Sequence, residues 1–408
     1  MDPVVLFVFA VVYAGMMLGG LPGLALDRTG VALLGAIVLV AAGRVTPEVA
    51  WAAIDAPTLA LLFALMVLSA QFAASGFFEW CAGAIAATRA PATRILTIVV
   101  AVAGALAAVL TNDVVVWAMT PVLVRGLGAR GLDPRPFVIA LAMAANAGSA
   151  ATLIGNPQNL LIAGAGKLEF WPFLAACGVP ALVALVLVRV VVGGLARRTL
   201  RSDVLPESAE TVMVRPRPPD RAALAKGALA AVVVIAVFTL PVDRAHWMLA
   251  VAGLLLLSRR LGTRRMLSMV DWHLLLLFAA LFVVTGALAA SGVTSRAVAM
   301  LGADNLRAPA TFALAALVGS NTIGNVPLVM VMLSAGLDLG TAQFYALALF
   351  STLSGNLLVV GSLANIIAIE RAGAEGVVIS FTDYARLGIP VTLASLAFAW
   401  GWLQVVPV

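Results

Sequence analysis

Apolar runs separated by short polar turns follow one another along almost the whole chain. A run of roughly 20 apolar residues can cross a bilayer as an α-helix. We expect five such spans in the first half of the chain, at about 3–24, 29–43, 55–75, 137–166 and 171–195. Five more are expected at about 224–240, 245–258, 274–292, 341–369 and 384–403. The pattern predicts an all-α polytopic membrane protein with about ten transmembrane helices.

Two further apolar runs, at about 95–124 and 308–335, are interrupted by polar residues near their middle. As a straight helix the first would measure about 45 Å, against a hydrocarbon core of about 30 Å. Arg94 precedes it and Arg125 follows it, which places both of its ends on the cytoplasmic side. The second run has no basic cluster at its flanks, so we expect it to enter from the outer side. Both runs are predicted to be re-entrant hairpins, and the first has the tip Thr111-Asn112-Asp113.

Two of the expected spans contain residues that interrupt a helix. In the span 137–166, Pro157 removes a backbone hydrogen bond and nearby glycines weaken the helix. Gly155 and Asn159 of this span recur at the same spacing in the span 341–369, as Gly361 and Asn365. We therefore expect two broken helices. Such backbone is tolerated at membrane depth only where protein or a water-filled cavity surrounds it.

The sequence also repeats itself at a larger scale. Residues 274–292 echo residues 59–76, and five spans separate the two copies. Because five is odd, the second copy must have the opposite orientation in the membrane. We expect a first repeat at 1–195, a cytoplasmic linker at 196–223 and an inverted second repeat at 224–408. Inverted repeats with broken helices are typical of secondary transporters.

Most of the arginines lie in the short turns that this topology assigns to the cytoplasm, and Arg28 is one of these turn residues. Both termini are then predicted on the outer side of the cell membrane, meaning a plasma or inner membrane. The net charge of +6 is explained by this distribution, so we expect no nucleic-acid partner.

The composition, 63% apolar and 11% charged, excludes a soluble protein of this length. Cys81 and Cys177 lie far apart in apolar surroundings, so we expect neither a disulfide framework nor a metal site. The chain has no phosphate-binding loop and no HExxH or GxSxG pattern. We therefore expect no enzyme, and no cofactor other than a proton or sodium ion that couples transport.

The candidate binding residues lie at the hairpin tips and helix breaks, because half-helix N-termini attract anions and freed carbonyls can ligate cations. They are Thr111, Asn112, Asp113, Asn156, Asn159, Ser320, Asn321, Thr322, Asn325, Asn356, Ser362 and Asn365. Each asparagine could instead cap a half-helix. Asp113 is an acid deep inside an apolar run, where a charge costs at least about 2.5–3.5 kcal/mol. We predict that it couples transport by titrating or binding a cation, and the alternative is a helix cap.

These motifs resemble the ion transporter superfamily, and more narrowly its ArsB/NhaD-type permeases and YbiR-like putative anion transporters in the citrate-transporter-like group. The resemblance rests on Thr111-Asn112-Asp113, Gly155-Asn156-Pro157-Gln158-Asn159, Asn325-Val326-Pro327 and Gly361-Ser362-Leu363-Ala364-Asn365. It implies ten spans with two hairpins, an elevator-like movement, a site between tips and breaks, and a homodimer. Ser320-Asn321-Thr322 fits the tip motif of dicarboxylate–sodium symporters, whereas the first tip departs from it, which favours proton coupling or export.

The leading functional prediction is an ion-coupled secondary active transporter of a small inorganic or organic anion, with the lipid bilayer and this substrate as partners. An alternative is arsenite or antimonite efflux, since neutral As(OH)3 would suit an Asn-rich, Arg-poor centre. A sodium/proton antiporter would want more buried carboxylates than Asp113 alone. A channel would show flux proportional to the gradient with no dependence on a counter-ion.

Overall fold

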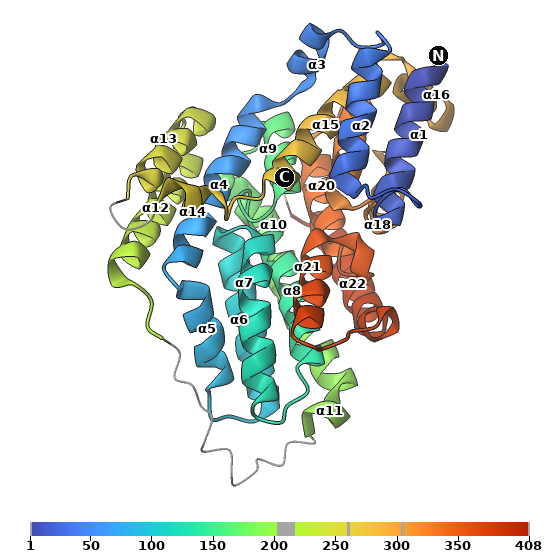
Figure 1. Cartoon of the computed structure of the whole chain (residues 1–408). Helices are drawn as coiled ribbons and strands as arrows, with labels where there is room; N and C mark the ends of the chain where they lie inside the picture. Colours follow the sequence, from blue (N-terminus) through green and yellow to red (C-terminus); the bar gives the residue numbers. More distant parts are fainter. Residues whose placement is uncertain (1, 202–216, 259–261, 303–304, 306, 407–408) are drawn as a thin grey trace.

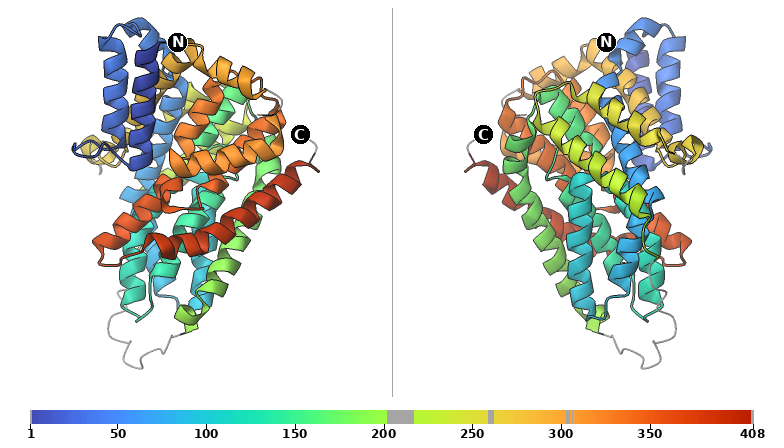
Figure 2. Two further views of the ribbon diagram at one scale, coloured as in Figure 1. Left: turned by 90° about the vertical axis from the view of Figure 1, so that its right-hand side faces the viewer. Right: turned by 90° about the vertical axis from the view of Figure 1, so that its left-hand side faces the viewer.

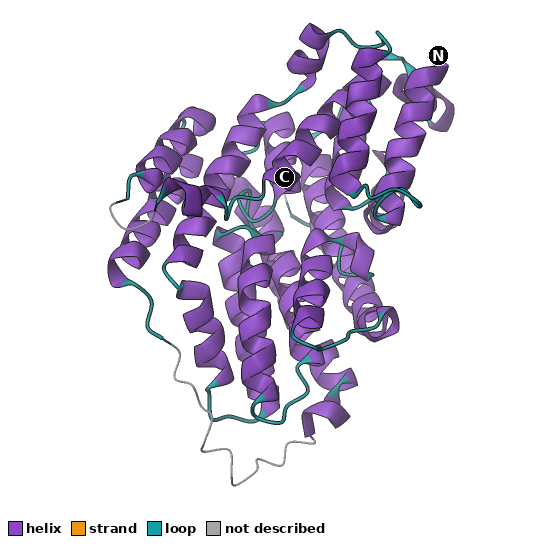
Figure 3. Ribbon diagram, viewed as in Figure 1, coloured by secondary structure: helices purple, strands orange, loops and turns teal. Residues whose placement is uncertain are grey.

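The computed structural model describes residues 2–201, 217–258, 262–302, 305 and 307–406. Helices make up its regular structure, and the described residues contain no strand (Figure 3). The all-α prediction is therefore confirmed. Residues 202–216 of the expected linker lie outside the described residues.

The first half of the chain forms ten helices before the short α11 (Arg197–Arg201). They are α1 (Pro3–Leu18), α2 (Arg28–Ala41), α3 (Pro47–Ala53), α4 (Ala56–Ala74), α5 (Phe77–Ala86), α6 (Ala92–Val109), α7 (Asn112–Gly128), α8 (Arg135–Ser149), α9 (Pro157–Gly166) and α10 (Phe170–Leu195).

The second half forms a matching series among the described residues. It consists of α12 (Arg221–Thr239), α13 (Arg244–Leu256), α14 (Thr263–Leu267), α15 (Trp272–Ala290), α16 (Val293–Leu301), α18 (Pro309–Thr322), α19 (Asn325–Ser334), α20 (Thr341–Ser354), η2 (Val359–Gly361), α21 (Leu363–Ala374) and α22 (Phe381–Leu403).

The two series run in opposite directions. The comparable helices α4 and α15 are each capped at the N-terminus by an aspartate, which accepts a hydrogen bond from the N–H three residues later. Gly286 near the end of α15 packs against Ala53, just before α4, while the Trp272 ring at its start lies 5.8 Å from the Phe63 ring. The helices are thus antiparallel, as inverted repeats require.

The expected spans differ in length. In the described residues α4, α10, α12, α15 and α22 are long and apolar enough to cross a membrane, and so is α6 of the first hairpin. The helices α1, α2 and α13 are shorter, with 16, 14 and 13 residues. The first span ends at Leu18 rather than residue 24, because Gly19 takes a left-handed conformation with φ 82°.

The repeats are packed into one another. In each repeat the first hairpin helix lies along the first half of the broken helix, α6 on α8 and α18 on α20. Across the repeats α2 packs on α15 and α13 packs on α4. Figures 1 and 2 show α5, α6 and α7 in the lower half of the molecule and α1, α2 and α3 in the upper half. The hairpin tips and helix breaks meet between these two groups.

Candidate functional site

The first hairpin turns at Leu110 and Thr111, which both have extended backbone between α6 and α7. The Thr111 hydroxyl lies 3.1 Å from that of Ser69 on α4. The Asn112 N–H donates to the carbonyl of Gly155 at 3.2 Å. The tip is thus fixed against both a neighbouring span and the first helix break.

The second hairpin turns at Ile323 and Gly324, and α19 begins at Asn325. Gly324 has φ 95°, which favours glycine because a side chain would be strained there. The side-chain oxygen of Asn325 accepts from the N–H of Val326 at 2.9 Å. The N-cap of α19 is Gly324, so Asn325 is the first residue of the helix rather than its cap, and it lines a cavity.

The two helix breaks are braced in the same way. In the first repeat the Asn159 amide donates to the carbonyls of Ser149 and Thr152, at 3.2 and 2.8 Å. In the second repeat the Asn365 amide donates to the carbonyls of Gly355 and Leu358, at 2.7 and 3.2 Å. Asn159 thereby satisfies two carbonyls that the broken helix leaves without a backbone partner. Asn365 does so for Gly355, whereas the Leu358 carbonyl also accepts from the N–H of Gly361 at 3.1 Å.

Asn146 on α8 joins the two repeats at the centre of the site. Its side-chain oxygen accepts from the Asn112 amide and from the Ser362 hydroxyl, each at 3.0 Å. Its amide donates to the oxygens of Asn356 and Asn365, at 2.9 and 3.0 Å. All four hydrogen-bonding positions of this carboxamide are used. Asn146 was not predicted, although an asparagine inside an otherwise apolar helix was a visible sign.

A smaller cross-repeat contact occupies the comparable position in the second repeat. The Thr352 hydroxyl on α20 accepts from the amides of Asn156 and Gln158, at 3.3 and 3.1 Å. The Asn156 oxygen also caps α9 by accepting from the N–H of Asn159 at 2.9 Å. Asn156 is therefore a helix cap and a member of the polar network at once.

The three predicted residues at the end of α18, Ser320, Asn321 and Thr322, make different contacts from those of the first tip. Asn321 donates to the carbonyl of Ser354 at 2.8 Å and accepts from the N–H of Leu358 at 3.1 Å, so it clamps the second break. Ser320 donates to the carbonyl of Ser351 at 3.2 Å. Thr322 is exposed and donates only to carbonyls of its own helix. Neither Ser320 nor Thr322 lines the central cavity.

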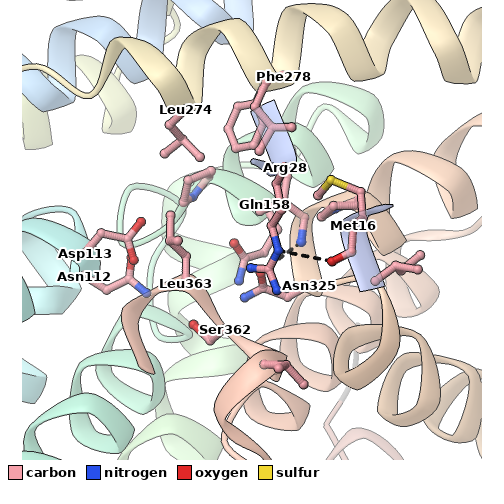
Figure 4. A pocket seen from close by; sticks show the side chains of 17 residues that line it. Met16, Arg28, Asn112, Asp113, Gln158, Leu274, Phe278, Asn325, Ser362 and Leu363 are labelled. Atoms are coloured by element: carbon pink, nitrogen blue, oxygen red, sulfur yellow. Dashed lines mark hydrogen bonds between the residues drawn. The ribbon is translucent and has the colours of Figure 1, made fainter. Parts of the chain in front are cut away.

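A cavity of about 60 Å³ lies between the tips and the breaks (Figure 4). N-terminal residues of four helices line it: Asn112 and Asp113 of α7, Pro157 and Gln158 of α9, Asn325 and Val326 of α19, and Leu363 of α21 beside its cap Ser362. Leu274, Leu277 and Phe278 of α15 supply an apolar wall. A volume of this size holds a small ion with a few waters.

Two charged side chains, Arg28 and Asp113, are among the described residues lining this cavity. The carboxylate of Asp113 has no hydrogen bond or ion pair with another described residue. Asp113 also lines a neighbouring cavity of about 240 Å³ together with Asp271. Arg28 reaches the cavity from the start of α2. The description of the centre as Arg-poor is thus incomplete, because a turn arginine is long enough to enter it.

Several buried acceptors near the centre are left without a hydrogen-bond partner in the described residues. They include the side-chain oxygens of Asn112 and Asn159 and the hydroxyl of Ser354. An unpaired buried polar group is costly, and of these three residues it is Asn112 that lines the cavity, so its oxygen is available to a polar ligand or cation there. In the second repeat, the oxygen comparable with that of Asn159 is satisfied by Asn146.

Residues 4–344 match the family model described as Citrate transporter. The chain belongs to the citrate transporter family. This confirms the recognised citrate-transporter-like group, and the chain is a multi-pass membrane protein whose substrate is an ion or a small molecule. Since this is a family of transporters, the coarse functional prediction of transport is confirmed as well.

The chain is similar to several other proteins, over different shares of its length. It is 31% identical to the 46 kDa membrane protein of Mycobacterium leprae, over 93% of this chain and 94% of that protein. It is 39% identical to the silicon efflux transporter LSI3 of Oryza sativa, over 43% of this chain and 36% of LSI3. The YdaH transporter of Alcanivorax borkumensis has a similar fold, with a TM-score of 0.58, 15% identity, and coverage of 98% and 96% of the two chains.

Proposed function

We propose that this member of the citrate transporter family is an ion-coupled secondary active transporter of a small inorganic or organic anion. The observation that carries the proposal is the convergence of the N-termini of α7, α9, α19 and α21 on one cavity. Each N-terminus carries a partial positive charge, and together they favour an anion.

Asp113 supplies the coupling site in this proposal. Asp113 is the second residue of α7 and lies at the edge of the same cavity. Its carboxylate has no partner among the described residues. A charge in such surroundings is costly unless a proton or a cation balances it. Binding of that ion beside the anion would link the movements of the two.

The hairpins and broken helices would carry the site as one unit past α1, α2, α4, α13 and α15, in alternating access. This division is supported by the packing of each hairpin on the broken helix of its own repeat, α6 on α8 and α18 on α20. The basic turns around Arg89, Arg94, Arg125, Arg130 and Arg135 lie at the ends of α5, α6, α7 and α8. We infer that this end is cytoplasmic, that both termini are outside the cell membrane, and that the protein forms a homodimer.

The experiment is uptake by proteoliposomes that contain the purified full chain. Citrate, succinate, sulfate, phosphate and arsenite are offered under imposed proton and sodium gradients. We expect one anion to accumulate above equilibrium only when a proton or sodium gradient is present. Flux proportional to the anion gradient alone would indicate a channel, and proton exchange for sodium without an anion would indicate an antiporter. Either result would contradict the proposal.

The second candidate is efflux of an inorganic solute such as arsenite or antimonite. Two observations favour it. The unpaired buried oxygen of Asn112 in the cavity suits a hydroxylated neutral solute, and the rice relative is a silicon efflux transporter. In the same assay this candidate predicts transport of arsenite with no transport of the charged solutes.

A further inference from the structure

Arg28 is the first residue of α2 and extends into the central cavity from outside the hairpin and break segments. Its Nε donates to the carbonyl of Met16 on α1 at 3.1 Å. The preceding residue, Asp27, caps α2 by accepting from the N–H of Gly30 at 2.8 Å. The Nε of Arg28 is therefore held by the end of α1, and the two Nη groups point away from this contact.

The free edge of this guanidinium faces the polar side of the cavity. Figure 4 shows it among Gln158, Asn325 and Ser362, which belong to α9, α19 and the cap of α21. Among the described residues no acidic side chain lies within ion-pairing distance of Arg28, and its two Nη groups make no hydrogen bond. Asp113 lines the same cavity but lies apart from it in this view.

Glu370 attracts Arg28 only from beyond ion-pairing distance. A half-buried cation without an ion-pair partner is unfavourable, and an anion in the cavity would relieve this cost. Because Nε is engaged by Met16, the two Nη groups present a planar pair of donors. Such a pair matches two oxygens of a carboxylate or an inorganic oxyanion, and a lysine ammonium does not reproduce this geometry.

We propose that Arg28 binds the negative charge of the transported anion and determines that the substrate is a carboxylate or oxyanion rather than a neutral hydroxylated solute. The inference rests on the proposed function and deepens it, because it names the group on the substrate that is recognised. The four helix N-termini hold the anion from one side, and Arg28 closes the site from the other.

The test compares the wild type with Arg28→Gln and Arg28→Lys in proteoliposomes, using the anion that the solute scan identifies. Arg44→Gln is the matched control, since Arg44 is exposed and its ion pair, with Asp2, is long at 3.5 Å. We expect Arg28→Gln to raise KM at least about tenfold, as for loss of a charged hydrogen bond. Arg28→Lys should restore part of the affinity, and Arg44→Gln should leave KM unchanged.

A second readout separates recognition from a structural role. Competition by a neutral and an anionic solute of similar size, arsenite and sulfate, is measured for each variant. In the wild type and Arg44→Gln the anion should compete better, whereas Arg28→Gln should lose this preference while its thermal midpoint in detergent stays close to wild type. If Arg28→Gln does not fold, the same comparison is made with Arg28→Lys, which should keep only part of the preference because its ammonium lacks the paired donors.

The outcomes distinguish the two proposals. If the wild type transports no anion, the proposed function itself is wrong. If the wild type transports an anion and both Arg28 variants keep its KM and its preference over arsenite, only the role of Arg28 is overturned.

Discussion

The two repeats share their scaffold and differ in their hairpin chemistry. Asn159 and Asn365 brace the two breaks through the same pattern of carbonyls, those 10 and 7 residues earlier in the chain. The hairpins do not match in this way. Asn112 of the first tip donates to Asn146 at the centre, whereas Asn321 of the second hairpin clamps its own break.

Charge is divided between the repeats as well. The residue after Asn112 is Asp113, and the residue after Asn325 is the apolar Val326. The first tip therefore brings a carboxylate to the cavity and the second does not. The two repeats therefore share their architecture but not the charge at their hairpin tips.

The largest expected effect is that of Asn146→Ala, because this residue joins the repeats through four hydrogen bonds. Each buried polar group left unpaired costs roughly 1–3 kcal/mol, so we expect loss of transport and a clearly lower thermal midpoint in detergent. Thr352→Ala is the matched change in the other repeat and removes two hydrogen bonds. Equal effects of the two variants would contradict the central role of Asn146.

The next comparison uses the paired glycines of the breaks. A Cβ at Gly155 would lie 2.6 Å from the Cα of Ser149 and 2.8 Å from the carbonyl oxygen of Ala107, which are fixed backbone atoms. A Cβ at Gly361 would meet the side-chain oxygen of Asn321 at 2.5 Å and the carbonyl of Gly355 at 2.9 Å. We expect Gly155→Ala to lower the thermal midpoint more than Gly361→Ala, because a side chain yields more easily than backbone.

Two tip asparagines should then separate binding from stability. Asn112→Ala removes a group that lines the cavity, so we expect a several-fold higher KM for the transported anion with a modest loss of stability. Asn321→Ala removes two bonds to the second break, so we expect a lower thermal midpoint and a lower transport rate with little change in KM. The opposite pattern would show that the second tip binds the substrate.

The smallest effect is expected for Thr322→Ala. The hydroxyl is exposed and bonds only to Val318 and Gly319 of its own helix. Exposed substitutions of this kind usually change stability by less than about 0.5 kcal/mol, so KM and rate should stay within about twofold of wild type. A tenfold loss of transport would show that this threonine enters the site in another state of the transport cycle.

Apolar run lengths, prolines and the odd number of spans were sufficient to predict the helices, the hairpins and the inversion. The helices, the hairpins and the inversion depend on features that can be read directly from the sequence. Examples are the helix-breaking Pro157 and the equal spacing from Gly155 to Asn159 and from Gly361 to Asn365. The prediction of ten spans was accurate in order, although three are short and two are broken.

The parts that sequence reasoning missed depend on contacts between distant segments. Asn146 and Arg28 lie outside the tip and break motifs, and each acquires its place through residues far along the chain. Arg28 followed the rule for cytoplasmic turns, which concerns only its side of the membrane and does not give the direction of its side chain. The 1–195 and 224–408 boundaries, the homodimer and the roles of the site residues stay predictions.

The most direct test of the account measures exchange and accumulation separately for the wild type and Asp113→Asn. Proteoliposomes loaded with the identified anion report exchange, and proteoliposomes with a proton or sodium gradient report uphill accumulation. If Asp113 couples transport, the variant should retain exchange but lose accumulation, because the site still binds the anion without the coupling ion. Full gradient-driven accumulation by Asp113→Asn would contradict the account.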